Sequence, residues 1–547
     1  MTVHGGIAAV RAALSHGVET MFTLSGAHVF PMYDAAVGGA DSVRAGRLGP
    51  MRLIDVRHEQ TAVFAAEAMG RLTRTPGLAV LTAGPGVTNG VSAIANAHAA
   101  GSPLVVVGGR APDGRWGSGA LQELDHPQIV ASITKRASTV HDAAGVGPAI
   151  DDAFMLARAP HRGPVFVDVG MDVLFTPADA ADPAGHSPAP VLPDPEALRG
   201  IAARAAAARH AVLILGSDVW ADGAEVAAAA FAEATGIPVI ANGMGRGILP
   251  SGHPLLVTRA RSHALRNADL VIVAGTPLDF RLGYGAFNDG AAVVHLADSP
   301  DQVARHAALA GSASGSLLEI FDGLLAEWTA PMNTFADWAT TLRERAAAAF
   351  AEDRVVLTST ADPIHPARVI GDVISRLTED TVVIGDGGDF VSFAGRFIEP
   401  ARPGRWLDPG PYGCLGTGPG YAMAARIAHP QAPVVLLLGD GAAGFSLMDV
   451  DSLVRHDLPV VMVVGNNSGW GLERHPMRFL YGYDVAADLR PTAYDEVVRA
   501  LGGAGETVTS PDAIGPALDR ALASGVPYLV NVMTDPETSY PRSTTGV

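Results

Sequence analysis

Short apolar runs alternate with longer amphipathic segments along most of this chain. Two of the runs, residues 434–438 and 459–464, are rich in Val, Leu and Met with no polar alternation, which is typical of strands buried on both faces of a parallel sheet. Residues 445–456 between them have the spacing of a helix. Because parallel strands need a crossover connection, these segments predict one right-handed βαβ unit.

The same alternation recurs in three parts of the sequence. Further strands are expected at 52–56, 78–82, 104–107, 211–216, 238–241, 270–274, 293–296, 381–384 and 528–532. Two stretches outside this pattern, 176–195 and 327–363, are interpreted as linkers, although the second includes a charged helical segment. We therefore expect an α/β protein of three doubly wound parallel-sheet domains, at 1–175, 196–326 and 364–547.

Composition narrows the class of protein. The 547 residues are 48% hydrophobic and carry a formal net charge of −18, which argues against binding to nucleic acid. No apolar run approaches the ~18 residues of a membrane span. Residues 1–22 lack the uninterrupted apolar stretch of a signal peptide, so a cytoplasmic location is expected. Cys414 is the single cysteine and is interpreted as a small apolar filler rather than a nucleophile.

Candidate chemistry lies at the end of the βαβ unit. Asp440 follows the first apolar run and Asn467 follows the second, and both strands deliver their last residues to the same edge of the sheet. A carboxylate with an amide oxygen suits Mg²⁺ or Ca²⁺, and Mg²⁺ typically completes its shell with phosphate oxygens and water. The small residues Gly439, Gly441 and Ala442 leave backbone N–H groups free to face a diphosphate.

A dinucleotide site is the alternative for this segment, because residues 439–444 also satisfy the G-x-G-x-x-G pattern. Such a site needs an acid at the end of the next strand to bind the ribose hydroxyls. Asn466 and Asn467 stand there instead, which disfavours the dinucleotide. The segment from Asp440 to Asn467 resembles the motif of thiamine-diphosphate enzymes.

Over nearly its full length the chain resembles the acetolactate synthase group of thiamine-diphosphate enzymes. The matching stretches are residues 57–59, 82–89, 121–123 with Lys135, and 439–467. The resemblance implies an N-terminal domain that binds the cofactor's pyrimidine, a central domain, and a C-terminal domain that binds its diphosphate.

The resemblance also implies site residues in the N-terminal domain. Glu59 would contact N1′ of a cofactor held by the partner subunit, so the active form would be a homodimer or homotetramer. A Glu at a helix start is otherwise explained by the helix dipole alone. Gln122 and Gly26 would face the reaction centre.

In the C-terminal domain the resemblance implies that Asp440, the Asn467 side chain and the Gly469 backbone oxygen bind Mg²⁺. Leu415 takes the position of the bulky apolar residue that holds the cofactor in its bent form. Without the resemblance, Leu415 would pass as ordinary core.

Two departures from the acetolactate synthase pattern concern the substrate. Residues 24–28 are closer to the Gly-Ala-His stretch of benzaldehyde lyase, and His28 is either an acid/base group or a hydrogen-bonded structural histidine. Residues 466–471 also resemble that lyase, and Trp470 either walls the acceptor pocket or fills the core.

A third departure is the loop 385–390, which has two acids where acetolactate synthases contact diphosphate through Gln and His. Asp386 and Asp389 would repel phosphate unless they are hydrogen-bonded or turned away. The backbone amides of Gly387 and Gly388 are therefore expected to contact the diphosphate.

The central domain leaves its ligand open. Residues 278–281 resemble the segment with which acetolactate synthases bind FAD, whereas residues 260–262 resemble 2-hydroxyacyl-CoA lyases and oxalyl-CoA decarboxylases, which bind ADP or CoA there. Either nucleotide would use Gly216 and Arg281. A purely structural domain is the third alternative.

The resemblance implies a thiamine-diphosphate and Mg²⁺ dependent enzyme that decarboxylates pyruvate or a similar 2-oxo acid and joins the acyl unit to a second carbonyl, as in branched-chain amino acid biosynthesis. A lyase acting on 2-hydroxyacyl-CoA or aromatic 2-hydroxyketones is the alternative, followed by an FAD-linked pyruvate oxidase. A non-catalytic relative is disfavoured because Glu59, Asp440 and Asn467 are all present.

Overall fold

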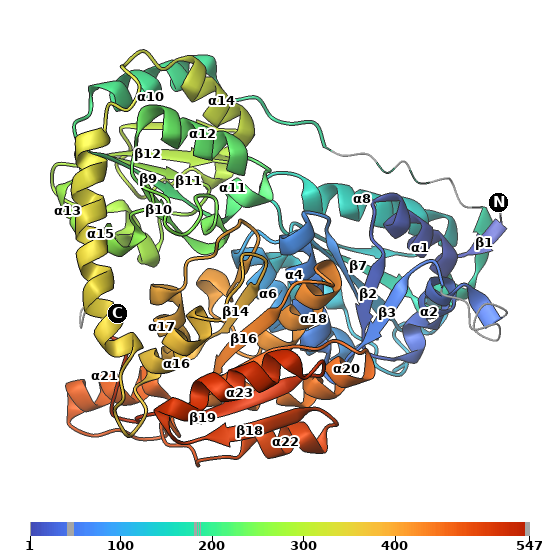
Figure 1. Ribbon diagram of the computed structural model, residues 1–547. Helices are drawn as coiled ribbons and strands as arrows, with labels where there is room; N and C mark the ends of the chain where they lie inside the picture. The colour runs from blue at the N-terminus through green and yellow to red at the C-terminus, as the bar shows by residue number, and fades with distance from the viewer. Residues whose placement is uncertain (1, 41–48, 180–182, 184, 186–187, 542–547) are drawn as a thin grey trace. The chain divides into compact units, whose positions relative to one another are not determined.

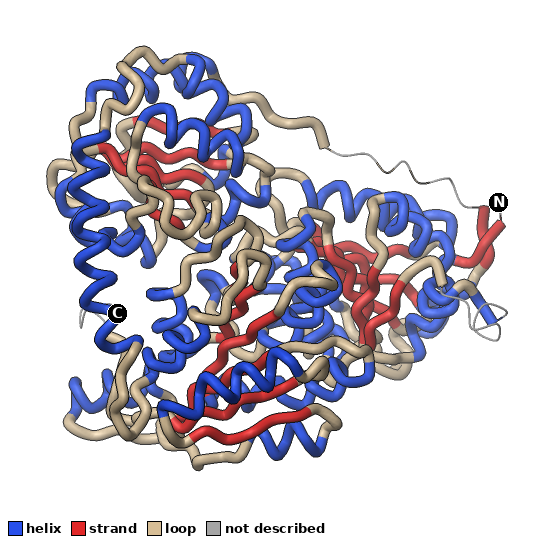
Figure 2. Tube along the Cα trace, in the orientation of Figure 1, coloured by secondary structure: helices blue, strands red, loops and turns tan. Residues whose placement is uncertain are grey.

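The computed structural model describes residues 2–40, 49–179, 183, 185 and 188–541. The chain forms two compact units. The first contains Met1–Pro188, Ile384–Ser392 and Asp408–Val547, and the second contains Ala189–Val383 and Phe393–Leu407. Three parallel sheets with helices around them make up these units (Figure 1, Figure 2), so the predicted α/β class with three sheet domains is confirmed.

The N-terminal sheet has the order β3-β2-β4-β5-β7-β6, and its pairings are parallel. Its strands are β2 (Thr20–Thr23), β3 (Arg52–Asp55), β4 (Gly77–Leu81), β5 (Leu104–Arg110), β6 (Arg136–Val140) and β7 (Pro164–Gly170). One face packs on α1 (Gly5–Ser15), α2 (Phe30–Val37) and α8 (Val146–Arg158), whose side chains share a core with β4, β5 and β7. A separate antiparallel pair joins β1 (Thr2–His4) to β8 (Pro177–Asp179).

The C-terminal sheet has the order β15-β14-β16-β17-β19-β18. Its strands are β14 (Val382–Asp386), β15 (Trp406–Leu407), β16 (Val434–Gly439), β17 (Val461–Asn466), β18 (Ala504–Val508) and β19 (Tyr528–Met533). β16 and β17 are parallel neighbours in which Gly439 pairs with Gly465. The residues that follow these two strands therefore leave the sheet at the same edge.

The crossover between β16 and β17 is helical, as predicted, but it is not one helix. It consists of α19 (Asp440–Ser446), the 3-10 turn η10 (Leu447–Asp449) and α20 (Val450–Arg455). The break places Asp449 with its backbone in the helix N-cap position of α20, and its side chain turns to the N-terminal domain.

Two helices join the N- and C-terminal sheets within the first unit. α4 (Glu59–Thr73) and α18 (Gly418–Ala428) lie side by side (Figure 1). Their close approach needs glycine, since a Cβ on Gly420 would lie 2.9 Å from the Thr61 backbone oxygen. The Asp449 carboxylate accepts hydrogen bonds from Arg57 N at 2.7 Å and Thr61 Oγ1 at 2.6 Å. Packing and charge-assisted hydrogen bonds thus fix the start of α4.

The central sheet has the order β10-β9-β11-β12-β13, also parallel. Its strands are β9 (Ala211–Leu215), β10 (Val239–Ala241), β11 (Leu270–Ala274), β12 (Ala292–Ala297) and β13 (Gly311–Ser314). One face is covered by α10 (Pro195–Ala207), α12 (Glu225–Thr235) and α14 (Leu317–Ala326). The opposite face packs on α13 (Arg261–Asn267) and α15 (Ala336–Leu357).

The interpretation of 327–363 as a linker is wrong for its helical part. Trp338, Leu342 and Ala346 of α15 belong to the core cluster on one face of the central sheet, so this helix is part of that domain. The other expected linker, 176–195, includes β8, and residues 180–182, 184 and 186–187 lie outside the described residues. Within the described ranges, no helix combines the length and the apolar character needed to cross a bilayer.

Candidate active site

The two predicted magnesium ligands lie at the shared edge of β16 and β17. Asp440 is the first residue of α19, and its Oδ2 accepts a hydrogen bond from Gly469 N at 3.0 Å. Asn467 is the first residue after β17, and Gly469 is buried beside it. Carboxylate, amide and backbone oxygens are hard donors, so this set fits Mg²⁺ chemically.

The turn that carries Asn467 and Gly469 is held from behind. Asn466 is fully buried, and its amide donates to Asn531 Oδ1 and Thr492 O, both at 3.1 Å. Its Oδ1 accepts from Ser468 N at 3.1 Å, and Ser468 has a φ of 53°. Asn466 is thus a structural residue that holds the turn, and none of these hydrogen bonds uses the Asn467 side chain.

Burial sets the electrostatics of Asp440. Asp440 is only 2% exposed. Desolvation raises its pKa to about 6, although the backbone amides of Gly469 and Gly441 and the charge of Arg474 oppose this rise. Tyr494 Oη donates to the Asp440 backbone oxygen at 3.1 Å. A buried carboxylate that is costly to ionise gains from a nearby cation.

The start of α19 fits a diphosphate. Gly439 caps the helix without any side-chain hydrogen bond, and a Cβ built on Gly439 would meet nothing within 4 Å. A Cβ on Gly441 would lie 2.6 Å from the Trp470 ring, so that position has no room for a side chain. Ala442, the next residue, is buried. Uncapped N–H groups at a helix start favour an anion.

Trp470 lies against the start of this helix. In addition to its contact at Gly441, its ring packs edge-on to Phe445, with 6.3 Å between centroids. Trp470 N donates to Ala487 O at 2.8 Å. The ring is half-buried and therefore walls the α19 terminus rather than filling a core.

The two acids of the loop 385–390 are both hydrogen-bonded to backbone. Asp386 is fully buried and accepts from Gly416 N at 2.9 Å and Gly418 N at 2.8 Å. Burial raises its pKa to about 6, against the opposing effect of those amides. Asp389 accepts from Tyr540 N at 3.0 Å. Both carboxylates are thus hydrogen-bonded, which is what a phosphate close to this loop would require of them.

Leu415 lies on the segment that Asp386 holds. A Cβ on Gly387 would lie 2.0 Å from Leu415 Cδ2, so the Leu415 side chain sits directly on the Gly387 backbone. Gly387 and Gly388 both have positive φ, at 54° and 84°. A Cβ on Gly388 would meet nothing within 4 Å, so the Gly388 backbone is open where a side chain would stand, whereas Leu415 covers that face of Gly387.

The N-terminal acid lies where a helix begins. Glu59 is the first residue of α4, is 7% exposed, and its Oε2 accepts from Asn89 Nδ2 at 3.0 Å.

The Cys414 thiol has its pKa raised to about 11 by burial, which disfavours a thiolate and agrees with its interpretation as a filler.

The residues predicted to face the substrate gather at the carboxyl edge of the N-terminal sheet. His28 is 5% exposed, and its Nδ1 lies 3.1 Å from Thr82 Oγ1. Burial lowers the pKa of His28, while a hydrogen bond with the Leu121 backbone raises it and the nearby His126 lowers it further. Gly26 lies against the same threonine, since a Cβ there would be 2.2 Å from Thr82 Cβ.

Gln122 stands beside this group. Its φ is 59°, a conformation that side chains rarely adopt, and it packs against Gly84, whose built Cβ would be 2.9 Å from Gln122 Cβ. Strained backbone of this kind is often found at functional sites.

The sequence did not single out Thr82 or Asn89 as site residues, although both lie in the matched stretch 82–89.

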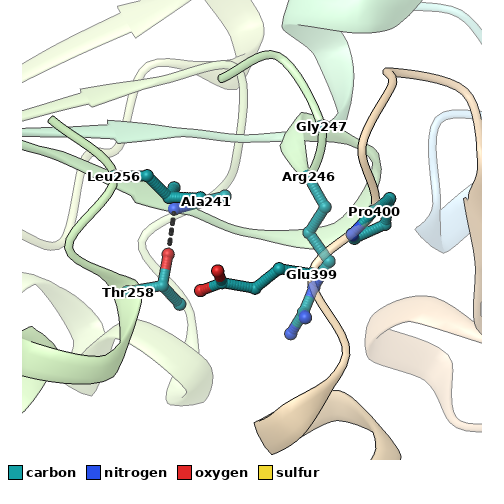
Figure 3. Close-up of a pocket in the computed structure, with 7 residues that line it drawn as sticks. All are labelled: Ala241, Arg246, Gly247, Leu256, Thr258, Glu399 and Pro400. Atoms are coloured by element: carbon teal, nitrogen blue, oxygen red, sulfur yellow. Dashed lines mark hydrogen bonds between the residues drawn. The ribbon is translucent and has the colours of Figure 1, made fainter. Parts of the chain in front are cut away.

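The second unit, which contains the central sheet, has a small pocket. It has a volume of about 210 Å³ and is lined by Ala241, Arg246, Gly247, Leu256, Thr258, Glu399 and Pro400 (Figure 3). Only about 10 Å³ of this space can hold the centre of a water molecule, so the pocket is too small for a nucleotide. Arg281, one of the two predicted nucleotide contacts, is held by the Asp279 carboxylate at 2.7 Å, and a Cβ on Gly216 would lie 2.3 Å from Gly275 O.

Comparisons with known proteins agree with this architecture. Family models match residues 3–129 as "Thiamine pyrophosphate enzyme, N-terminal TPP binding domain", 198–320 as "Thiamine pyrophosphate enzyme, central domain" and 386–532 as "Thiamine pyrophosphate enzyme, C-terminal TPP binding domain".

Relatives match along almost the whole chain. The chain is 46% identical to the acetolactate synthase large subunit IlvG of Mycobacterium tuberculosis and to a probable acetolactate synthase of Mycobacterium bovis, over 99% of this chain and 97% of each relative. It is 32% identical to human 2-hydroxyacyl-CoA lyase 2, over 97% of this chain and 90% of the lyase. The chain belongs to the thiamine pyrophosphate enzyme family.

Proposed function

We propose that this chain is a thiamine-diphosphate and Mg²⁺ dependent decarboxylase and carboligase of the acetolactate synthase type, with pyruvate or a similar 2-oxo acid as donor. The observation that carries the proposal is the 46% identity, over nearly all of both chains, to proteins named acetolactate synthase. The presence of Glu59, Asp440 and Asn467 supports a working rather than a decayed site.

Each part of the cofactor has residues suited to it. When bound, thiamine diphosphate supplies the nucleophilic carbon and stabilises the carbanion. Asp440, Asn467 and the Gly469 backbone oxygen would hold Mg²⁺, and Gly441, Gly387 and Gly388 would offer N–H groups to the diphosphate. The chain's part is thus binding and orientation.

Two other residues would control the reacting end of the cofactor. Glu59, buried and hydrogen-bonded to Asn89, would share a proton with N1′ of the aminopyrimidine. Leu415, packed on Gly387, would support the bent form of the cofactor. The burial of Glu59 also excludes water, which strengthens charge interactions at the site.

His28 and Gln122 would face the substrate. Since burial lowers the pKa of His28, its imidazole is neutral at pH 7 and can accept or donate a proton at a carbonyl oxygen of the acceptor. Gln122 would donate a hydrogen bond from its amide. Trp470 would bound the acceptor side near Gly441.

We also propose that the active form is a homodimer or homotetramer. Large apolar side chains are exposed close to the site residues, among them Leu121 at 78%, Phe445 at 58% and Met448 at 53%. Exposed apolar groups of this kind favour burial against another chain. Glu59 would then serve a cofactor bound by the partner subunit.

In the central domain, FAD or ADP is the proposed nucleotide, with Gly216 and Arg281 as contacts. Arg281 would have to exchange the Asp279 carboxylate for a phosphate, which a guanidinium can do with similar geometry. The purified protein's visible spectrum distinguishes the two, because only flavin absorbs there.

A lyase is the second candidate function. The 32% identity to human 2-hydroxyacyl-CoA lyase 2 favours cleavage of a 2-hydroxyacyl-CoA, and the stretch 24–28 leaves a benzaldehyde lyase-like activity open. Incubation of the protein with thiamine diphosphate, Mg²⁺ and either pyruvate or a 2-hydroxyacyl-CoA separates the candidates. Acetolactate and CO₂ from pyruvate support the first proposal, whereas cleavage of the carbon–carbon bond of the 2-hydroxyacyl-CoA without pyruvate turnover replaces it with the second.

A further inference from the structure

Behind the turn that carries Gly84 lies a buried pair of ionisable side chains. His126 begins the short helix α7 (His126–Val130) and Asp168 lies in β7, and both residues are 0% exposed. Nδ1 of His126 lies 3.0 Å from Asp168 Oδ1, and Nε2 of His126 accepts a hydrogen bond from Gly84 N at 2.8 Å.

These two contacts fix the tautomer of His126. Gly84 N–H is a donor, so Nε2 must present its lone pair and the ring proton of a neutral imidazole lies on Nδ1, from which it is donated to Asp168. Burial raises the pKa of Asp168, while His126 and Arg110 lower it. Arg110 Nη1 lies 3.7 Å from Asp168 Oδ2 and so supports the ionised carboxylate that holds the ring.

The Gly84 turn leads directly to Glu59. Gly84 has φ 59° and ψ −114°, and its carbonyl accepts from Thr88 N at 3.0 Å as the short helix α5 (Pro85–Thr88) begins. Asn89 caps this helix and donates its side-chain amide to Glu59 Oε2 at 3.0 Å. One segment thus connects the His126 hydrogen bond at its start with the Glu59 hydrogen bond at its end.

We propose that His126, held by Asp168, is a positioning residue for Glu59. Its Nε2 holds the Gly84 N–H in place and thereby fixes the segment from which Asn89 orients the Glu59 carboxylate. Loss of that acceptor leaves a buried N–H without a partner, which the turn can relieve only by moving. This inference rests on the proposed role of Glu59 in the activation of the cofactor.

Two variants of similar length isolate the acceptor atom. In His126→Gln the side-chain oxygen can take the place of Nε2 and accept from Gly84, whereas in His126→Met only a weakly accepting thioether sulfur stands there. The assay is the rate at which the C2 proton of protein-bound thiamine diphosphate exchanges with deuterium, which needs no donor substrate. We expect His126→Gln to stay within a few-fold of the wild type and His126→Met to lose about tenfold or more.

A purely structural role predicts no such order, because folded His126→Gln and folded His126→Met should then exchange the C2 proton at the same rate. Equal exchange rates in the wild type and both variants, or equal losses in both variants, overturn the inference. If His126→Met does not fold, His126→Asn replaces it, because Asn can reach Asp168 but not Gly84. A wild-type exchange rate in folded His126→Asn also overturns the inference.

Failure of the proposed function is seen separately. Glu59→Gln should abolish C2 exchange while thiamine diphosphate still binds, and a wild-type rate in that variant removes the role assigned to Glu59 whatever His126 does. Absence of pyruvate turnover with normal C2 exchange removes only the proposed substrate, and the His126 comparison is then still decisive.

Discussion

The contact between Gly387 and Leu415 allows the support of the bent cofactor to be tested by a single methyl group. In Gly387→Ala the new Cβ would lie 2.0 Å from Leu415 Cδ2. Carbon atoms pack at ~3.5 Å or more, so the tip of Leu415 must retreat by about 1.5 Å. Because Leu415 is only half-buried, it has room to move, and the protein should fold.

The functional cost follows from that displacement. A misplacement of ~1 Å near a reacting centre can cost about a hundredfold in rate, so we expect kcat to fall by roughly tenfold to a hundredfold in Gly387→Ala. The positive φ of Gly387, 54°, adds a backbone cost of ~1–2 kcal/mol for a residue with a Cβ. That second effect needs a control.

Gly413→Ala is the matched control. Gly413 lies two residues before Leu415 and has a φ of 74°, but a Cβ there would meet nothing within 4 Å. It thus carries the backbone cost without the collision. The assay is kcat at saturating thiamine diphosphate, with the cofactor's Kd measured alongside. Equal kcat values in the two variants would refute the role of Leu415.

Three further predictions address other parts of the structure. Because burial raises the Asp386 pKa from 3.8 to about 6, its ionisation costs the folded state stability at pH 7, and this cost declines as the pH falls below about 6. The unfolding free energy of the wild type relative to Asp386→Asn should therefore rise by about 1 kcal/mol between pH 7 and pH 5 in denaturant titrations, and no change would contradict the buried charge. Thr61→Val should lower the unfolding free energy by ~1–3 kcal/mol, because it removes the hydroxyl that donates to buried Asp449 Oδ2 at 2.6 Å. Thr61→Ser should keep that hydrogen bond, and equal losses of unfolding free energy in the two variants would contradict this. A mixture of Glu59→Gln chains with Asp440→Asn chains should recover about a quarter of wild-type activity, because a hybrid dimer of the two variants has one intact site. No recovery would mean that both residues of a site come from the same chain.

The convergence of the C-terminal site could be predicted because it depends on topology alone. Two apolar runs with a helical connection are expected to be parallel strands of one sheet and are usually neighbours, and the pairing of Gly439 with Gly465 agrees with that expectation. The strand β2 was missed, since Thr20–Thr23 is short and has a threonine at each end. β7 was missed as well, although it is fully buried. Asp168 interrupts its apolar run, and its pairing with His126 and the nearby charge of Arg110 make that burial tolerable.

The supporting residues of the site could not be predicted, because their partners are distant in sequence. Asp386 binds amides thirty or more residues away, at Gly416 and Gly418. His126 and Gly84 are similarly separated. A sequence pattern shows that such residues are polar but not which backbone donors they meet. The proposed cofactor residues, such as Asp440 and Glu59, follow strands or begin helices, so their positions at the sheet edges could be predicted.

The most direct test of the account is pyruvate decarboxylation by the wild type, Glu59→Gln and Asp440→Asn at saturating thiamine diphosphate and Mg²⁺, with CO₂ and acetolactate measured together. The account predicts both products from the wild type, loss of turnover with retained cofactor in Glu59→Gln, and loss of Mg²⁺-dependent cofactor binding in Asp440→Asn. Wild-type turnover in Glu59→Gln, or no release of CO₂ from pyruvate by the wild type, would contradict it.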